Sequence, residues 1–296
     1  MGDLITILAP AKVNLFLRVL ERRPDGFHEL ETLFQAVALH DVVHVQVASD
    51  DEIHLVVEGA DVGPPEDNLA YRAALAYMKR ARVAAGLMIR LEKNIPAGAG
   101  LGGGSSDAAA VLKALNAAFG SPLADADLIS IGATLGSDVP FFLGAGPTAV
   151  GRGRGEQLEA VPALPEAHLV LALPPVHVAT GQAYQALSQR GLDSGGRRLG
   201  DPPASWAWVT TLAHNDFQAV VAEQHPEVAT ALAALEDVGG DPVLLSGSGA
   251  ACFGRFSSAS LANAAAEALT QRLGFPCVAA DTLTAFPALN RMGDTG

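Results

Sequence analysis

The stretch that decides the fold lies in the first half of the chain and reads Pro96-Ala97-Gly98-Ala99-Gly100-Leu101-Gly102-Gly103-Gly104-Ser105-Ser106. Five of its seven central residues are glycines, so backbone N–H groups can close around phosphate oxygens without side chains in the way. The sequence predicts a helix from about Ser106 to Phe119, whose N-terminus would add a partial positive charge. Ser105 and Ser106 are candidates to cap that helix or to bind a phosphate or Mg²⁺. The stretch therefore predicts a strand, an anion-binding loop and a helix.

Other interpretations of this loop fit less well. A turn that serves only close packing rarely needs so many glycines. Gly98, Gly100 and Gly103 match the dinucleotide pattern G-x-G-x-x-G, and Asp125 lies near the distance expected for a ribose-binding acid. The loop does not open a βαβ unit, however, and Asp125 follows a Ser-Pro break. No Lys follows the last glycine, so the loop is not a P-loop, and the protein-kinase motifs are missing.

The composition indicates a globular protein and excludes several classes. Hydrophobic residues make up 49% of the 296 residues and charged ones 17%, which is enough for a large core. A formal net charge of -13 argues against a nucleic-acid partner, which would need a surplus of cations. No apolar run reaches the length of a membrane span. Two cysteines without metal-ligand spacing are typical of a reducing, cytoplasmic protein.

The order of predicted elements favours an α+β fold with two domains. Strand-like alternation covers 5–19 with a break at Pro10, and helices are predicted over 68–82 and 180–190. Strands and helices do not alternate regularly as βαβ units. We place the domain boundary near 160, giving domains 1–160 and 161–296, and expect the tail after Pro287 to be loose.

Lys12 lies in an apolar strand, where a buried ammonium needs a partner or loses its charge. Strand alternation puts Asn14 on the same face, roughly 6–7 Å along. Lys12 and Asn14 either form a polar site within a hydrophobic sheet or lie on an edge strand, where the side chain of Lys12 reaches water. The local pattern leaves both possibilities open.

Two further segments carry candidate functional groups. Asp138, in the run Gly136-Ser137-Asp138-Val139-Pro140-Phe141-Phe142, is either a helix cap or an acid in a shielded pocket. The turn at 25–28 brings together an aromatic ring, Phe27, and an imidazole, His28. The ring is suited to stack on a planar base while the imidazole reads its polar edge, although a packed turn is the commoner outcome.

Taken together, these segments resemble one family. Ala9-Pro10-Ala11-Lys12-Val13-Asn14-Leu15, the turn leading into Glu29-Leu30, the glycine loop, the run at 136–142 and Ser246-Gly247-Ser248-Gly249 occur in the order found in the GHMP kinases. This family is named for galactose, homoserine, mevalonate and phosphomevalonate. The resemblance covers about residues 9–255. The opening motif with Gly26-Phe27-His28 is similar to that of members acting on a cytidine-diphosphate-linked methylerythritol, in isoprenoid precursor synthesis.

The resemblance implies a fold and a reaction. The N-terminal domain would be like domain 2 of ribosomal protein S5 and the C-terminal domain ferredoxin-like, with the active site between them. ATP with Mg²⁺ would phosphorylate the alcohol, and the metal ligands are unknown. Asp138 would be the catalytic base, and Lys12 beside it would lower the pKa of that acid and hold the hydroxyl. The protein would be a monomer or a homodimer.

The resemblance also assigns binding residues. Pro96 to Ser106 would wrap the ATP phosphates, and Asn68 and Lys93 would flank the adenine. His28 would read the cytosine and Asn14 would contact the alcohol. Tyr184 is our candidate for the second face of a cytosine sandwich opposite Phe27. The remaining candidates for the substrate wall are Thr180, Gly247, Ser248 and Gly249.

Three positions depart from the pattern of the family. Phe27 stands where Tyr is common, and Ser137 replaces a frequent Ala. Asp107 stands where Asn is often found, so it would turn away, bind the metal or weaken ATP binding. The main alternative is another GHMP kinase, of the homoserine or mevalonate type. A nicotinamide-dependent oxidoreductase is a more distant alternative.

Overall fold

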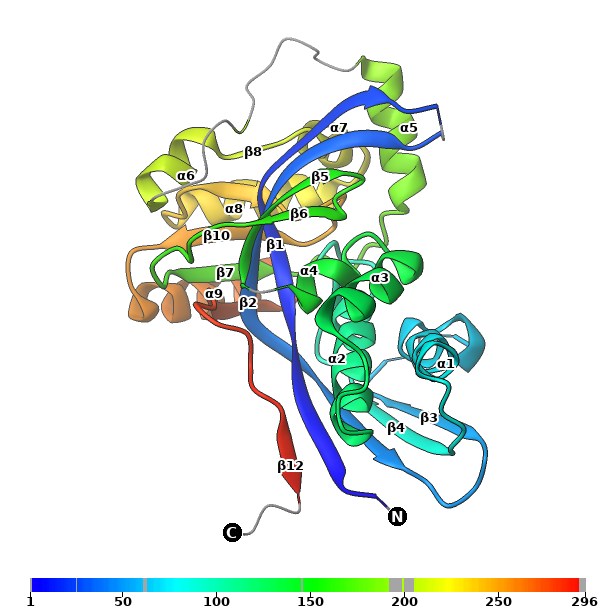
Figure 1. Ribbon diagram of the computed structural model, residues 1–296. Helices are drawn as coiled ribbons and strands as arrows, with labels where there is room; N and C mark the ends of the chain where they lie inside the picture. Colours follow the sequence, from blue (N-terminus) through cyan, green and yellow to red (C-terminus); the bar gives the residue numbers. More distant parts are fainter. Residues whose placement is uncertain are drawn as a thin grey trace.

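The computed structural model describes residues 2–24, 26–60, 63–144, 146–191, 199 and 205–292. Two long antiparallel strands, β1 (Leu4–Arg22) and β2 (His28–Val47), run along most of the molecule, and the other elements are arranged around them (Figure 1). From Ala9 to Val19 every residue of β1 is buried, because elements cover both of its faces. A polar side chain in this part of β1 therefore points into the interior.

The larger sheet is built on this strand pair. Its main order is β12-β1-β2-β4-β3, β5 and β6 extend it from β2, and β8 pairs in parallel with β1. Register shifts at Pro10/Ala11, Asn14/Phe16 and Val19/Arg22 bend the β1–β2 ladder. The added strands are β3 (Ile53–Glu58), β4 (Leu87–Glu92), β5 (Thr148–Gly153), β6 (Gln157–Ala160), β8 (His214–Asn215) and β12 (Asn290–Met292).

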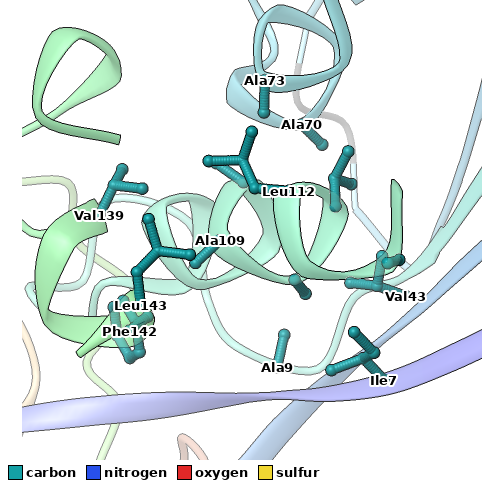
Figure 2. Close-up of a cluster of buried hydrophobic side chains, with 14 of the residues drawn as sticks. Ile7, Ala9, Val43, Ala70, Ala73, Ala109, Leu112, Val139, Phe142 and Leu143 are labelled. Atoms are coloured by element: carbon teal, nitrogen blue, oxygen red, sulfur yellow. The ribbon is translucent and has the colours of Figure 1, made fainter. Parts of the chain in front are cut away.

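Helices pack on one face of the N-terminal part of this sheet. The alanine-rich α2 lies in the middle of a buried cluster, with Ala70 and Ala73 of α1 on the side of Leu112 and Ile7 and Ala9 of β1 on the opposite side (Figure 2). Small residues let α2 approach its neighbours closely. The short η1 (Pro65–Asp67) precedes the four helices α1 (Leu69–Ala81), α2 (Gly103–Ala118), α3 (Asp125–Leu135) and α4 (Val139–Leu143).

The smaller sheet is antiparallel, with the order β11-β7-β10-β9. A second hydrophobic cluster lies between this sheet and its helices, and a third joins residues of β1, such as Val13 and Leu15, to Leu171 and Phe253. The two sheets therefore share a core. The elements are β7 (His168–Ala172), α5 (Thr180–Arg190), α6 (Trp206–Leu212), α7 (Phe217–Gln224), α8 (Pro226–Asp237), β9 (Val243–Leu245), β10 (Cys252–Phe256), α9 (Ala259–Leu273) and β11 (Cys277–Asp281).

Three local expectations were wrong. The first strand continues through Pro10, because a bulge takes up the proline. The helix after the glycine loop begins at Gly103, with Gly102 as its N-cap, so neither Ser105 nor Ser106 caps it. The tail after Pro287 is not loose over Asn290–Met292, since β12 pairs with the start of β1, and residues 293–296 lie outside the described residues. No helix in the described ranges is long and apolar enough to cross a membrane.

Candidate active site

A cavity of about 1250 Å³ lies where the two sheets meet. Its walls come from β1, β2, the glycine loop, the end of α3, α5 and the loop after β9. The lining includes eleven of the candidate residues from the sequence, which are Lys12, Asn14, Gly100, Gly102, Phe27, His28, Asp138, Thr180, Tyr184, Gly247 and Ser248. Segments far apart in the chain therefore converge on one site.

The ammonium of Lys12 and the carboxylate of Asp138 lie next to each other in the wall of this cavity. Lys12 Nζ lies 3.5 Å from Asp138 Oδ2. Lys12 is only 3% exposed in a central strand, so the alternative of an edge lysine reaching water is excluded. Asp138 directly precedes α4 but makes no capping hydrogen bond, and 28% of its side chain is exposed. Asp138 is thus open to the cavity instead of serving as a helix cap.

A chain of hydrogen bonds fixes Lys12. Its Nζ donates to Asn14 Oδ1 at 2.8 Å, and Asn14 Nδ2 donates to Thr32 Oγ1 at 2.8 Å. Thr32 Oγ1 in turn donates to the backbone oxygen of Phe16 at 2.7 Å. Thr32 was not found from the sequence, because its approach to Asn14 depends on the bulged register of β1 and β2. This chain leaves Asn14 oriented with its oxygen toward Lys12.

Burial also sets the electrostatics of Lys12. Desolvation lowers the pKa of Lys12, and the negative charge of Asp138 and its hydrogen bond offset part of this effect. The ring of Phe34 lies 5.5 Å from Nζ, where its face attracts a cation. The site thus holds an ammonium whose main compensating charge is the carboxylate opposite.

The glycine loop is wedged between β1 and the loop that follows β9. The backbone N–H of Lys12 donates to Leu101 O at 2.9 Å, and that of Ala251 donates to Ala99 O at 3.0 Å. Gly100 has a φ of 78°, and a Cβ there would lie 2.1 Å from Ser246 O. Its neighbours Gly98 and Gly102 also have positive φ, and an added Cβ would meet His177 or Lys12. Close packing therefore requires these glycines, whatever the loop binds.

The N-terminus of α2 leaves backbone donors unpaired at the edge of the cavity. The N–H of Ser106 is the first to be paired within the helix, at 2.9 Å from Gly102 O. The Ser105 hydroxyl lies near Gly136, which lines the cavity, whereas Ser106 is buried on another side of α2. Gly104 is exposed and adjoins the start of α1 through Leu69. Pro96 is half-buried and Ala97 exposed at the start of the loop.

Asn68 and Lys93 have structural partners. Asn68 is the N-cap of α1 and accepts from Ala70 N at 2.9 Å. Lys93 Nζ forms ion pairs with Asp41 Oδ2 and, at 2.6 Å, with Asp107 Oδ2, and all three side chains are at most 5% exposed. Asp107 thus turns away from the loop and toward Lys93. A contact of Lys93 with a nucleotide would have to come from its backbone.

The aromatic end of the cavity lies at the β1–β2 turn, of which Asp25 is outside the described residues. The imidazole of His28 stacks on the ring of Tyr184, with centroids 4.9 Å apart and planes 13° apart. Phe217 packs edge-on against the other side of Tyr184 at 4.8 Å. Phe27 is 53% exposed, and the guanidinium of Arg154 lies 4.9 Å from its ring. Aromatic faces and a cation are therefore grouped some distance from Lys12.

Two pKa values differ from their ordinary ranges at this end. Burial, and then the charge of Arg22, lower the pKa of His28, which keeps its imidazole neutral and able both to donate and to accept. Burial, and then the charge of Asp138, raise the pKa of Tyr184 to about 12, so its hydroxyl stays protonated.

The loop after β9 forms the remaining wall. Asn215 Nδ2 donates to Leu245 O and Gly247 O, at 2.7 and 2.8 Å, and so holds this loop in place. Ser248 Oγ lies 3.1 Å from Thr180 Oγ1 at the start of α5. Gly249 packs behind the wall, where an added Cβ would meet Leu245. Asn215 was not found from the sequence, since a single Asn after a helix carries no local signal.

One cluster of possible metal ligands lies outside the cavity. Glu166, His168 and Asp281 offer ligand atoms within 4.8 Å of one another. Pairing of β7 with β11 brings His168 opposite Asp281, and their side chains form a hydrogen bond of 2.7 Å. The sequence showed no histidine paired with other ligands, because Asp281 is far from Glu166 and His168 in the chain. The strand pairing alone accounts for the cluster.

Comparison with known proteins places the chain in a family. The family model described as "GHMP kinases N terminal domain" matches residues 68–146, and "GHMP kinases C terminal" matches residues 203–274. The 4-diphosphocytidyl-2-C-methyl-D-erythritol kinase of Deinococcus radiodurans is 44% identical over 266 residues, covering 89% of this chain and 88% of the relative. The protein of the same name from Syntrophotalea carbinolica is 41% identical, covering 93% and 98%.

Solved structures agree with these relatives. A crystal structure of 4-(cytidine 5'-diphospho)-2C-methyl-D-erythritol kinase, 38% identical in sequence, matches with a TM-score of 0.80 and covers 94% of this chain and 98% of its own. A homoserine kinase from Cytophaga hutchinsonii, 20% identical, matches with a TM-score of 0.72 over 99% and 98% of the two chains, a likeness of fold alone. The chain belongs to the 4-diphosphocytidyl-2-C-methyl-D-erythritol kinase family of the GHMP kinases.

Proposed function

We propose that this chain transfers the γ-phosphoryl group of ATP to the 2-hydroxyl of 4-(cytidine 5'-diphospho)-2-C-methyl-D-erythritol, giving the 2-phosphate and ADP. The reaction belongs to the non-mevalonate route to isopentenyl diphosphate. The observation that carries the proposal is the Lys12–Asp138 pair, 3.5 Å apart, in a cavity with the glycine loop on one side and the His28–Tyr184 stack at the far end.

Asp138 acts as the base. The 2-hydroxyl oxygen attacks the γ-phosphorus, the bond from that phosphorus to the ADP oxygen breaks, and the hydroxyl proton passes to the Asp138 carboxylate. Lys12 holds the hydroxyl and offsets negative charge that develops on the transferred group. Asn14 and Thr32 keep Lys12 in position through the hydrogen bonds that connect them. The open, uncapped carboxylate of Asp138 supports this role.

The start of α2 holds the phosphates of ATP. Unpaired N–H groups of Gly103, Gly104 and Ser105 point to the same side as the positive end of the helix dipole. Asn68 adjoins this point through the neighbouring start of α1, which supports its place beside the adenine. Lys93 contacts the nucleotide through its backbone, because its side chain is held by Asp41 and Asp107.

The start of α2 offers an oxygen donor that suits Mg²⁺. The hydroxyl of Ser105 lies beside the cavity wall at Gly136. Mg²⁺ is usually held by few protein ligands together with phosphate oxygens and water, so one hydroxyl and the ATP oxygens suit it. When bound, the ion neutralises charge on the phosphate oxygens. Lys12 and the N-terminus of α2 supply the remaining positive charge from the protein.

The far end of the cavity binds the cytidine group. The cytosine enters between the rings of Phe27 and Tyr184 when the neutral imidazole of His28, which stacks on Tyr184 in the structure, turns away to pair with the polar edge of the base. Arg154 and Arg22 line the same end and suit the diphosphate. Thr180, Gly247 and Ser248 form the wall along which the substrate extends.

We also propose a fold type for each of the two domains. The smaller sheet follows the order β7, helices, β9, β10, α9, β11, which supports a ferredoxin-like domain over 161–296. The helix-covered sheet of 1–160 is assigned to the fold of ribosomal protein S5 domain 2. Both β8 and β12, from beyond residue 160, add to the N-terminal sheet, so the C-terminal part of the chain contributes strands across this boundary.

A coupled assay of ADP release tests the proposal. The wild-type protein should turn over the cytidine-linked alcohol with ATP and Mg²⁺, and should leave homoserine and mevalonate unchanged. Asp138→Asn should abolish transfer while ATP still binds, as measured by calorimetry. Turnover of homoserine or mevalonate would make this another GHMP kinase, and near-normal turnover by Asp138→Asn would refute the assignment of the base.

A further inference from the structure

The last segment of the chain crosses from the smaller sheet to the larger one. We call residues 283–292 the strap; it leaves β11 and ends as β12 beside β1 (Figure 1). At its start, Leu283 N donates to Ala36 O and Gln35 Nε2 donates to Leu283 O, both at 2.9 Å. At its end, β12 pairs with β1 in the register Leu4 to Met292. The strap is thus anchored at both ends to β1 and β2.

Between these anchors, one side chain of the strap packs on α4. The ring of Phe286 lies edge-on to Phe141, with centroids 5.7 Å apart and planes 72° apart, and 6.5 Å from the ring of Phe142. Phe286 is half-buried and belongs to the edge of the N-terminal core. It is the aromatic residue of the strap and supplies the ring contacts with α4.

Phe141 connects this ring to both members of the Lys12–Asp138 pair. Its ring lies 5.1 Å from that of Phe34, whose own ring lies 5.5 Å from Lys12 Nζ. Phe141 also follows Asp138 by three residues, and α4 begins directly after that acid. Phe286 therefore supports two things through Phe141: the ring of Phe34 beside the Lys12 ammonium, and the start of α4, next to the Asp138 carboxylate.

Lys113 forms a second link to the same helix. Its Nζ donates to Phe142 O at 2.6 Å and lies 5.0 Å from the centroid of the Phe286 ring. Burial lowers the pKa of Lys113 to about 8, and Asp125 offsets part of this effect. Because Lys113 comes from α2, it joins the helix of the glycine loop to the helix that carries Asp138.

We propose that the strap is a positioning element for phosphoryl transfer, in which Phe286 and Lys113 hold α4 so that Asp138 keeps its place opposite Lys12. This inference rests on the proposed function for the role of that pair. A five-residue helix has little stability of its own, so its position depends on what packs against it. A shift of about 1 Å in a catalytic group can cost on the order of 100-fold in rate.

Kinetics of Phe286→Ala test the inference. We expect kcat to fall about 10- to 100-fold, while KM for ATP changes less than about threefold, since the nucleotide contacts are untouched. Phe286→Leu should recover part of the loss, because it refills much of the space. Phe275→Ala is the matched control: it also removes a partly buried ring, but from the C-terminal cluster, and it should lower thermal stability without lowering kcat.

Hydrogen exchange supplies a measurement that needs no substrate. The backbone amides of 139–144 should exchange faster in Phe286→Ala and in Lys113→Met than in the wild-type protein and in Phe275→Ala. Unchanged exchange in this segment, or equal loss of kcat in Phe286→Ala and Phe275→Ala, would overturn the inference. If the wild-type protein fails to phosphorylate the cytidine-linked alcohol, the proposed function fails, and the exchange result still decides whether the strap holds α4.

Discussion

The imidazole of His28 lies flat on the ring of Tyr184, with centroids 4.9 Å apart, at the end of the cavity away from Lys12. Tyr184 is backed by Phe217, so its ring is held with one face directed to the β1–β2 turn. A planar base that stacks on this face of Tyr184 must first displace the imidazole of His28, while Phe217 holds the ring of Tyr184 in place.

Replacement of Tyr184 should therefore weaken binding of the cytidine group. We expect Tyr184→Ala to raise KM for the cytidine-linked alcohol about 5- to 100-fold, the range that loss of one base stack gives, with KM for ATP unchanged. Tyr184→Phe is the control and should behave like the wild-type protein, because the face of the ring carries the contact. Equal KM values for Tyr184→Ala and the wild type would place the cytosine elsewhere.

Replacement of Lys12 should act on turnover much more than on ATP affinity. Lys12→Ala removes the ammonium opposite Asp138, and we expect kcat to fall about 100- to 10,000-fold. The Kd for ATP, measured by calorimetry, should stay within about threefold, since the backbone of the loop binds the phosphates. Lys79→Ala, which removes an exposed lysine at the end of α1, should change neither. A parallel loss of ATP affinity in Lys12→Ala would make Lys12 a nucleotide ligand.

The buried cluster of Lys93, Asp41 and Asp107 predicts opposite effects for two substitutions. Lys93→Met leaves two carboxylates without a cation and should destabilise the fold by about 3–5 kcal/mol. Asp107→Asn leaves one ammonium with one carboxylate, so at pH 8 it should be neutral or stabilising. Urea denaturation measures both. Stability of Lys93→Met equal to that of the wild type would mean that the cluster is not held as an ion pair.

The pH dependence of stability should also change in Asp107→Asn. Burial raises the pKa of Asp107 from 3.8 to about 7, with Lys93 offsetting part of the effect, so the folded state binds this proton more tightly than the unfolded chain. As pH rises from about 4 to about 7, the contribution of Asp107 to the free energy of unfolding falls, by up to about 1.4 kcal/mol per pH unit, and it is constant above that window. Denaturation curves of Asp107→Asn should lack this component. Identical pH profiles for the two proteins would contradict it.

The packing of the glycine loop can be tested apart from its binding role. Gly100→Ala adds a Cβ at a positive φ and 2.1 Å from Ser246 O, so we expect a loss of at least about 3 kcal/mol in the free energy of unfolding. Gly120→Ala is the control, with the same φ of 78° and no atom within 4 Å of the added Cβ. It should cost only about 1–2 kcal/mol of backbone strain. Similar losses in the two variants would show that the loop is not wedged.

Local pattern was enough to predict several elements and one half of the site. The helix over 180–190 has the predicted bounds, because helical spacing marks it directly. Alternation in β1 also placed Asn14 beside Lys12, where the two side chains form a hydrogen bond. Such features depend on neighbours in the sequence.

The features that were missed depend on distant contacts. β8 and β12 have two and three residues, too few to carry a period, and they exist because β1 offers them an edge. Thr32 reaches Asn14 only through the bulged ladder of β1 and β2. Whether Asp138 faces Lys12 or caps α4 was left open by the local pattern, since no such pattern joins residues so far apart. The family resemblance implied that the two residues are neighbours, and the fold brings their side chains to 3.5 Å from each other.

β1 and β2 run without interruption through the larger sheet and pack against the smaller one in the third hydrophobic cluster, so a swing of one half of the molecule against the other would break this shared core. The bulges bend the two strands locally, but they leave the strand pair continuous. Exclusion of water during the reaction then falls to side chains and short loops at the rim of the cavity. Scattering curves recorded with and without both substrates should accordingly give the same radius of gyration.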